Sequence, residues 1–216
     1  TKEPGVVDGV FADRGGGNIA QYQKCMNLTD EKVTAWKNGH TSMMQQAQEL
    51  ITSVDKARGI LIANNANIEG VNARMFENYR YKDTWENGDE TRDDVIALIN
   101  EKGNRISEVH GEENFGSFNY NQTVAAYLIG AYEYSYYAST HGWTLQSGWD
   151  EMWQNPDYDK DLGEPLSDAT YNNKTKIWNR EFKSGTKVYL DLEWNYPCIK
   201  WGDGSMTGTT ANCNKY

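Results

Sequence analysis

The chain has 216 residues, of which 38% are hydrophobic, a length that suits one domain or one domain with an appended subdomain. Its formal net charge of −10 argues against a nucleic-acid surface and against binding to anionic membranes. The chain has no run of about 18 apolar residues, so we expect no membrane-spanning helix. The 8 Trp, 14 Tyr and 5 Phe suit a core and also stacking on sugar rings.

The first predicted strand covers residues 5–13, where an apolar run ends at Asp13 and three glycines follow. Catalytic groups lie where buried parallel strands end, so Asp13 is a candidate for acid–base chemistry. Its simpler interpretation is a turn residue or a helix cap. Asp8 lies deeper in the same strand, where a buried charge is costly unless paired, so we expect it to hold an Arg or a backbone group in place.

A helix is predicted over residues 29–56, with Thr29 as its N-cap and acidic residues in its first turn. Strands follow at 59–65 and 71–77, and both end in polar residues. These terminal side chains are Asn64, Asn65 and Glu77. The alternation of strand and helix indicates a parallel α/β domain.

The next elements are a helix over 90–102, a strand over 105–112 and an aromatic helix over 122–139, and residues 141–143 are compatible with a short fifth strand. Glu108, His110 and Glu112 alternate along one strand and therefore share a face. They are substrate or proton-relay groups if that face points inward, and solvated groups if it does not.

The pattern changes near residue 149, which divides the chain into residues 1–148, with βα units, and residues 149–216 packed on the same domain. In the second part, a long loop over 150–175 precedes a β-hairpin over 176–192 with a Ser-Gly turn.

Cysteines and glycosylation sequons indicate a secreted protein. Cys198 and Cys213 enclose a loop rich in Gly and Thr, and a disulfide there would pin the tail. Cys25 is then either a buried free thiol or the partner of a part of the protein outside this chain. Acceptor sequons begin at Asn27, Asn121 and Asn173.

Several short segments together carry a family resemblance: 7–13 (VDGVFAD), 60–65 (ILIANN), 69–78 (EGVNARMFEN), 105–112 (RISEVHGE), 162–169 (LGEPLSDA) and 178–182 (WNREF). Their order resembles the C-terminal half of a glycoside-hydrolase-like (β/α)8 barrel of the polygalactosaminidase-like and hypothetical glycosyl hydrolase type. The resemblance implies an α/β fold, a partial or half TIM-like barrel with a C-terminal hairpin. Strands one to three have no counterpart, so a longer precursor, a second chain or an open sheet is expected.

The resemblance also implies a secreted carbohydrate-active protein, a glycoside hydrolase that cleaves a polysaccharide or oligosaccharide with Asp13 as one catalytic carboxylate. We take Glu77 as the second because of its position after a strand; a salt bridge to Arg74 or Arg80 is its alternative role. Two such carboxylates lie about 5–5.5 Å apart in retaining enzymes and about 6.5–9.5 Å apart in inverting ones.

Further candidates are substrate-binding residues, for which packing or strand termination is the alternative: Asn64, Asn65, Glu108, His110, Tyr79 and Trp143. Tyr81, Trp85 and Trp149 are additional stacking candidates. We expect no cofactor and no metal, since the chain has no tight His/Cys ligand spacing. Two other functions remain open: a non-catalytic polysaccharide-binding or extracellular assembly protein, and a polysaccharide lyase with a Tyr or His base.

Overall fold

The computed structural model of the protein describes residues 9–13, 15–17, 19–54, 56, 59–77, 79, 89–112, 120–140, 155–192, 196–208, 213–214 and 216. Within these ranges, the side chains of 21, 89–92, 112, 120–122, 139–140 and 196 are not described. Predictions for Asp8, Arg80, Tyr81, Trp85, Trp143 and Trp149 therefore lie outside the described residues, as do those for the side chains of Glu112 and Asn121. The chain divides into two compact units, Thr1–Phe76 and Glu77–Tyr216, and each is described by itself.

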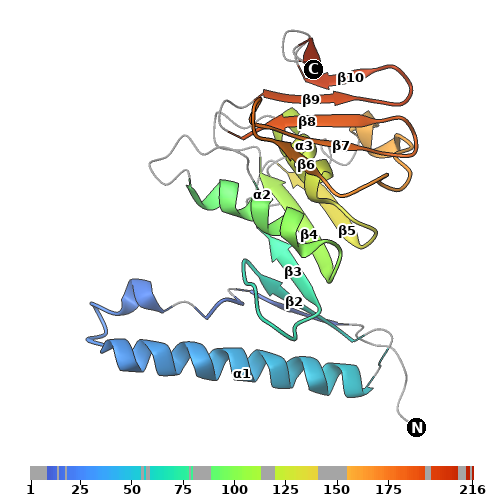
Figure 1. Cartoon of the computed structure of the whole chain (residues 1–216). Coiled ribbons are helices and arrows are strands. Elements are labelled where there is room, and N and C mark those ends of the chain that lie inside the picture. Colours follow the sequence, from blue (N-terminus) through green and yellow to red (C-terminus); the bar gives the residue numbers. More distant parts are fainter. Residues whose placement is uncertain are drawn as a thin grey trace. The chain divides into compact units, whose positions relative to one another are not determined.

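The Thr1–Phe76 unit is a small parallel sheet covered by one helix (Figure 1). Its elements are β1 (Gly9–Ala12), the 3-10 helix η1 (Ala20–Tyr22), α1 (Asp30–Val54), β2 (Ile60–Asn64) and β3 (Ala73–Phe76). Strand β2 pairs in parallel with β1 on one side and with β3 on the other. Each predicted element is thus present, with ends shifted by a few residues.

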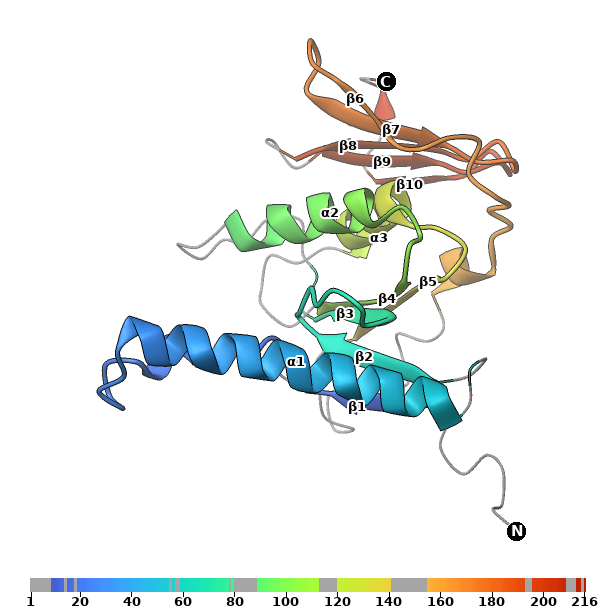
Figure 2. The same cartoon turned by 60° about the horizontal axis from the view of Figure 1, so that its bottom comes forward.

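Helix α1 packs on one face of β2 through a cluster of buried residues that contains Met44, Leu61 and Ala63 (Figure 2). Because side chains alternate along a strand, Asn64 lies on the opposite face of β2 from Leu61 and Ala63. Two side-chain contacts lock the helix to the strands: Gln48 Nε2 donates to the carbonyl of Gly59 at 3.1 Å, and Gln48 Oε1 accepts from the backbone N–H of Asn72 at 3.1 Å.

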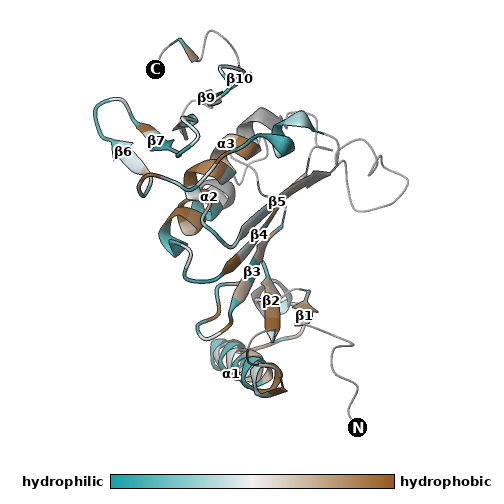
Figure 3. Ribbon diagram, turned by 90° about the vertical axis from the view of Figure 1, so that its right-hand side faces the viewer, coloured by the Kyte–Doolittle hydropathy of each residue, from teal (hydrophilic) through white to brown (hydrophobic). Residues whose placement is uncertain are grey.

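The predicted N-cap of α1 is confirmed, since the backbone N–H of Lys32 donates to Thr29 Oγ1 at 3.4 Å. Only Val33, Met44 and Gln48 are buried along this helix. The rest of the helix carries both hydrophilic and hydrophobic residues, whereas β2 is hydrophobic (Figure 3). The exposed hydrophobic residues of α1 include Trp36, Met43, Leu50 and Val54. No described helix is long and apolar enough to cross a bilayer.

The Glu77–Tyr216 unit begins with a second group of βα elements: α2 (Asp89–Glu101), β4 (Ile106–Glu112), α3 (Tyr120–Gly130) and β5 (Ser135–Thr140). β4 and β5 pair in parallel along six positions, from Ser107 and Ser135 to Glu112 and Thr140.

The prediction of one helix over 122–139 is wrong, because this stretch contains the end of α3, a turn and most of strand β5. Helix α3 ends at Gly130, where an added Cβ would lie 2.7 Å from Leu98 Cγ of α2, so the close approach of the two helices requires glycine. The following turn is fixed by Ser135, whose Oγ accepts from the backbone N–H of Tyr132 at 3.0 Å. The aromatic residues after it then favour a strand.

An antiparallel sheet completes this unit, with strand order β10-β9-β8-β7-β6. Its strands are β6 (Thr170–Asn172), β7 (Ile177–Glu181), β8 (Lys187–Asp191), β9 (Tyr196–Lys200) and β10 (Met206–Gly208), preceded by the 3-10 helix η2 (Pro156–Asp159). The predicted hairpin is β7–β8, while η2 and β6 lie where the sequence predicted only a loop. Helix α3 lies between this sheet and the β4–β5 pair (Figure 2).

Arg180 of β7 connects the antiparallel sheet to α3. Its side chain is 1% exposed, and its Nη1 donates to the carbonyl oxygens of Leu128 and Ile129 at 3.3 and 3.1 Å and to that of Ala131. These carbonyls belong to the end of a helix, where four carbonyls have no partner within the helix. Burial lowers the pKa of Arg180, and carbonyls accept from its Nη1 and from its Nε, which donates to that of Ser167 at 3.2 Å, while Nη2 is buried without a partner among the described residues.

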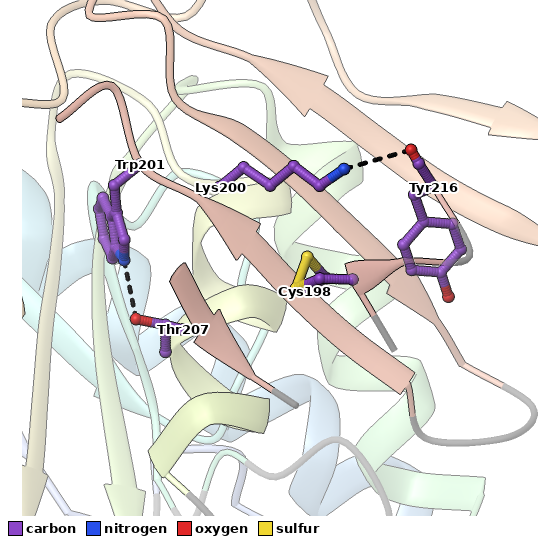
Figure 4. The surroundings of a disulfide bond; sticks show 6 residues. Cys198, Lys200, Trp201, Thr207 and Tyr216 are labelled. Carbon is purple, nitrogen blue, oxygen red and sulfur yellow. Dashed lines mark hydrogen bonds between the residues drawn. A yellow bond between two sulfur atoms is a disulfide. The ribbon is translucent and has the colours of Figure 1, made fainter. Parts of the chain in front are cut away.

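The predicted disulfide is confirmed: Cys198 of β9 is bonded to Cys213 (Figure 4). Tyr216 is held to the same strand, because Lys200 Nζ donates to its carbonyl at 3.3 Å. Cys25 is exposed, and its Sγ donates to the carbonyl of Tyr22 at 3.1 Å. Of the two alternatives for Cys25, the buried thiol is therefore wrong, because the residue lies on the surface just after η1.

The fold is thus a mixed α/β one, with parallel pairing among β1–β3 and between β4 and β5, and a separate antiparallel sheet. The residues that the structure describes form no closed barrel. A half TIM-like barrel stays a prediction.

Candidate functional site

The first candidate site lies at the carboxyl ends of β1 and β2. Ala12 pairs with Ala63, so the next residues of the two strands, Asp13 and Asn64, are adjacent. Asn64 is 3% exposed and its Nδ2 donates to Asp13 Oδ1 at 3.0 Å, while Asp13 is exposed. The carboxylate is therefore held by a buried amide and remains accessible to a ligand.

The backbone around this pair is tightly packed. Gly15 is buried, and an added Cβ there would lie 3.0 Å from both the Cα of Ala63 and the backbone N of Asn64. Asn65 has a left-handed conformation (φ 50°), and its N–H donates to the carbonyl of Met75 at 2.9 Å. The turn after β1 therefore fits closely over the end of β2, which fixes where Asn64 points.

His40, in the middle of α1, contacts the loop that follows β1. An added Cβ at Gly17 would overlap the imidazole of His40, so this ring packs directly over the glycine loop after β1.

The second group lies on β4. Val109 is fully buried, and Ser107 Oγ donates to Glu101 Oε2 of α2 at 2.8 Å, so the odd-numbered side chains face the helices. Glu108 and His110 consequently share the opposite face of the strand, as their alternation predicts. Of the two alternatives, a fully solvated face is wrong for His110, which is 7% exposed.

Burial alters the protonation of both groups. Desolvation lowers the pKa of His110 to about 4, so the imidazole is neutral near pH 7. Desolvation raises the pKa of Glu108, which therefore retains its proton to higher pH than an ordinary glutamate. A neutral imidazole can accept or donate a hydrogen bond, and a carboxyl with a raised pKa has the property that a general acid needs.

Glu77 and Tyr79 begin the Glu77–Tyr216 unit. Glu77 is half-buried and directly follows β3. Tyr79 is fully buried, its N–H donates to the carbonyl of His110 at 2.8 Å, and its hydroxyl donates to the carbonyl of Ala126 at 3.1 Å. Burial raises its pKa well above the usual value. Tyr79 thus connects β4 to α3 through two hydrogen bonds, and its full burial argues against the predicted stacking on sugar.

The sequon asparagines Asn27 and Asn173 are both exposed, Asn27 in a left-handed conformation and Asn173 in the turn between β6 and β7. Their exposure is compatible with modification, which stays a prediction.

The Glu77–Tyr216 unit also contains a pocket of about 320 Å³ that the sequence did not predict. Its aromatic lining includes Tyr127 and Tyr137 of the 120–140 region and Trp201 of the C-terminal sheet. The aromatic richness of the sequence was a signal for such a pocket. Residues separated by more than 60 positions, however, are brought together only by the packing of α3 against the antiparallel sheet.

Polar side chains at the carboxyl ends of parallel strands, one of them a positioned carboxylate, are the arrangement that α/β enzymes use. The chain belongs to the family described as hypothetical glycosyl hydrolase family 15, whose model matches residues 1–186. This confirms the glycoside-hydrolase-like resemblance and gives carbohydrate as the general substrate class. No curated protein matches the chain.

Proposed function

We propose that the protein is a secreted glycoside hydrolase that cleaves a polysaccharide with Asp13 and Glu77 as its two carboxylates. Family membership supports the reaction class. The observation that carries the assignment of Asp13 is its hydrogen bond from buried Asn64 at the end of β1.

Asp13 is the proposed nucleophile or general base. The Asn64 amide donates to Asp13 Oδ1 and so orients the carboxylate, and the exposure of Asp13 lets a sugar or water approach it. Asp13 would then attack the anomeric carbon, or remove a proton from water that attacks it, while the second carboxyl protonates the departing oxygen.

Glu77 is the proposed general acid, because it directly follows β3, the next strand after Asn64 along the chain. Glu108 is the competing candidate for this role, because burial already raises its pKa. Asn64, Asn65 and His110 are proposed to contact sugar hydroxyls, with His110 acting as a neutral hydrogen-bonding group.

The test compares Asp13→Asn, Glu77→Gln and Glu108→Gln for release of reducing ends from a panel of neutral and anionic polysaccharides. General acid–base and nucleophilic groups contribute about 10²- to 10⁴-fold, so Asp13→Asn and Glu77→Gln should each lose at least about 100-fold in kcat. Glu31→Gln, at an exposed position in the first turn of α1, is the matched control and should retain full activity.

The three variants separate the alternatives. Full activity in Asp13→Asn removes Asp13 from the mechanism, and loss in Glu108→Gln with retention in Glu77→Gln transfers the acid role to Glu108. Binding without any product in the wild-type protein would instead favour the non-catalytic alternative. Product absorbance from an unsaturated uronate would identify a lyase.

A further inference from the structure

The 320 Å³ pocket lies between α3, the first half of β5, η2 and the residue that follows β9. Its volume is at the lower end of the range of about 300–1,000 Å³ that small-molecule sites occupy. Its lining combines aromatic and aliphatic residues with two charged side chains, and the aromatic and charged residues are Tyr127, Tyr136, Tyr137, Tyr158, Trp201, Asp157 and Lys160.

One wall is held by hydrogen-bonded tyrosines. The rings of Tyr127 and Tyr137 stack with centroids 5.0 Å apart. The Tyr127 hydroxyl donates to the carbonyl of Ser135 at 2.8 Å, and the Tyr137 hydroxyl donates to Thr123 Oγ1 at 2.8 Å. Because both hydroxyls are anchored, these rings cannot turn away, and the wall is already formed without a ligand.

The opposite wall is built by the C-terminal sheet. Trp201 Nε1 donates to Thr207 Oγ1 at 2.7 Å (Figure 4), and this hydroxyl in turn donates to Asp157 Oδ2 at 2.7 Å. Lys160 Nζ lies 5.3 Å from the centre of the Trp201 ring and donates to Asp203 Oδ2 at 2.7 Å. Trp201, Thr207 and Asp157 are thus fixed in one chain of contacts.

The charges in the pocket compensate one another. Lys160 Nζ lies 3.9 Å from Asp157 Oδ1 as well as 2.7 Å from Asp203 Oδ2. An anionic ligand would have to compete with two carboxylates for this ammonium group. A ligand with hydroxyl groups and no charge meets no such penalty.

Two tyrosines of the pocket lining are exposed, Tyr136 at 59% and Tyr158 at 36%. The ring of Tyr158 lies edge-on to that of Tyr137, with centroids 6.2 Å apart. Neutral sugars have one apolar face of C–H groups and a rim of hydroxyls, which matches an aromatic surface bordered by Asp157 and Lys160.

We propose that this pocket binds one neutral sugar residue of a polysaccharide, with Tyr158 stacking on the ring. The choice of a carbohydrate rests on the proposed function. The pocket contacts residues 135–137 of β5, which pair with 107–109 at the amino-terminal half of β4. Tyr137 packs against Tyr127 and Thr123 of α3. Glu108 and His110 instead share the face of β4 that points away from the helices. The pocket is therefore an additional site, which would hold the polymer on the enzyme and raise its local concentration.

The test measures occupancy of this pocket directly. The probes are the neutral hexasaccharides maltohexaose, cellohexaose, mannohexaose and chitohexaose, added to the full chain carrying Asp13→Asn so that none is consumed. The readout is the indole N–H resonance of Trp201, assigned with Trp201→Phe. At least one hexasaccharide should shift this resonance in a saturable manner.

In this background Tyr158→Ala should weaken the binding seen at Trp201 about tenfold, since a stacked aromatic contact contributes up to about 1.5 kcal/mol. Tyr158→Phe retains the ring and should bind within about twofold of its parent. Tyr134→Ala is the matched control, because Tyr134 is 51% exposed in the same unit and does not line the pocket. The spectrum without sugar shows whether each variant is folded, and Tyr158→Leu replaces Tyr158→Ala if that variant is not.

Two results would overturn the proposed site: no hexasaccharide shifts the Trp201 resonance, or binding is unchanged when the Tyr158 ring is removed. Hydrolysis is measured separately with wild-type Asp13. If hydrolysis is found and Tyr158 has no effect, only the pocket proposal fails. If Tyr158-dependent binding is found without hydrolysis of any polysaccharide, only the proposed activity fails.

Discussion

Burial of His110 predicts a specific pH dependence of stability. Desolvation lowers the pKa of His110 from 6.5 to about 4 in the folded protein. A tenfold change in proton affinity is worth about 1.4 kcal/mol, so the full separation corresponds to about 3 kcal/mol. The unfolded chain binds the proton first as the pH falls. The free energy of unfolding is therefore undiminished above pH 6.5 and decreases between pH 6.5 and about 4.

Glu108 acts in the opposite direction on the same face of β4. Its raised pKa means that the folded protein takes up this proton before the unfolded chain, which adds stability as the pH falls. The wild-type curve contains both effects. Comparison with His110→Gln isolates the histidine, because Glu108 is present in both proteins.

The assay is urea denaturation at about pH 7.5 and about pH 4.5, with an NMR titration of the imidazole resonances. The wild type should lose about 2 kcal/mol more than His110→Gln between these two pH values. If the resonance absent from His110→Gln titrates near pH 6.5, or if both proteins lose the same stability, the reasoning from burial is wrong.

Three further predictions concern other contacts. Arg180→Met leaves the end of α3 without its donor and should lower the free energy of unfolding by about 3 kcal/mol in urea; a loss below about 1 kcal/mol would show that these carbonyls find other partners. Replacing Cys198 and Cys213 together by Ser opens a 15-residue loop and should cost about 3 kcal/mol, measured by thermal denaturation; reductant should have the same effect on the wild type and none on the variant. Gly15→Ala places a Cβ 3.0 Å from Ala63 and Asn64 and should lower hydrolytic activity. Gly16→Ala is the control and should not lower it, because the nearest atom to the added Cβ lies at 3.6 Å. Equal activity in the two variants would show that the packing of this turn does not affect the active site.

Local signals predicted the βα elements well. Thr29 and the acidic residues after it defined the start of α1, and the apolar run at 60–64 defined β2, because capping and strand burial are encoded by neighbouring residues. The boundary near Gly130 was missed, because Tyr and Ala suit both helix and strand in this stretch, and the glycine is required only by the packing of α3 against Leu98. Strand β10 has only three residues and exists through its pairing with β9.

The candidate site was predictable in part for the same reason. The positions of Asp13 and Asn64 at strand ends could be inferred from the chain, but their direct hydrogen bond depends on the register of β1 against β2. The alternation of Glu108 and His110 was predictable, whereas their burial depends on packing around β4. Trp201 and Tyr158 meet in one pocket only because the C-terminal sheet covers α3.

The packing of α3 against β8 and β9 has a consequence for any shortened form of this protein. The family match stops at residue 186, in the turn between β7 and β8, yet Val188 and Leu190 just beyond it are fully buried. A protein shortened at residue 186 would lack β8 and β9, which cover one side of α3. The exposed apolar surface of α3 would then promote aggregation. The boundary of shared ancestry and the boundary of an independently expressible polypeptide therefore fall at different places in this chain.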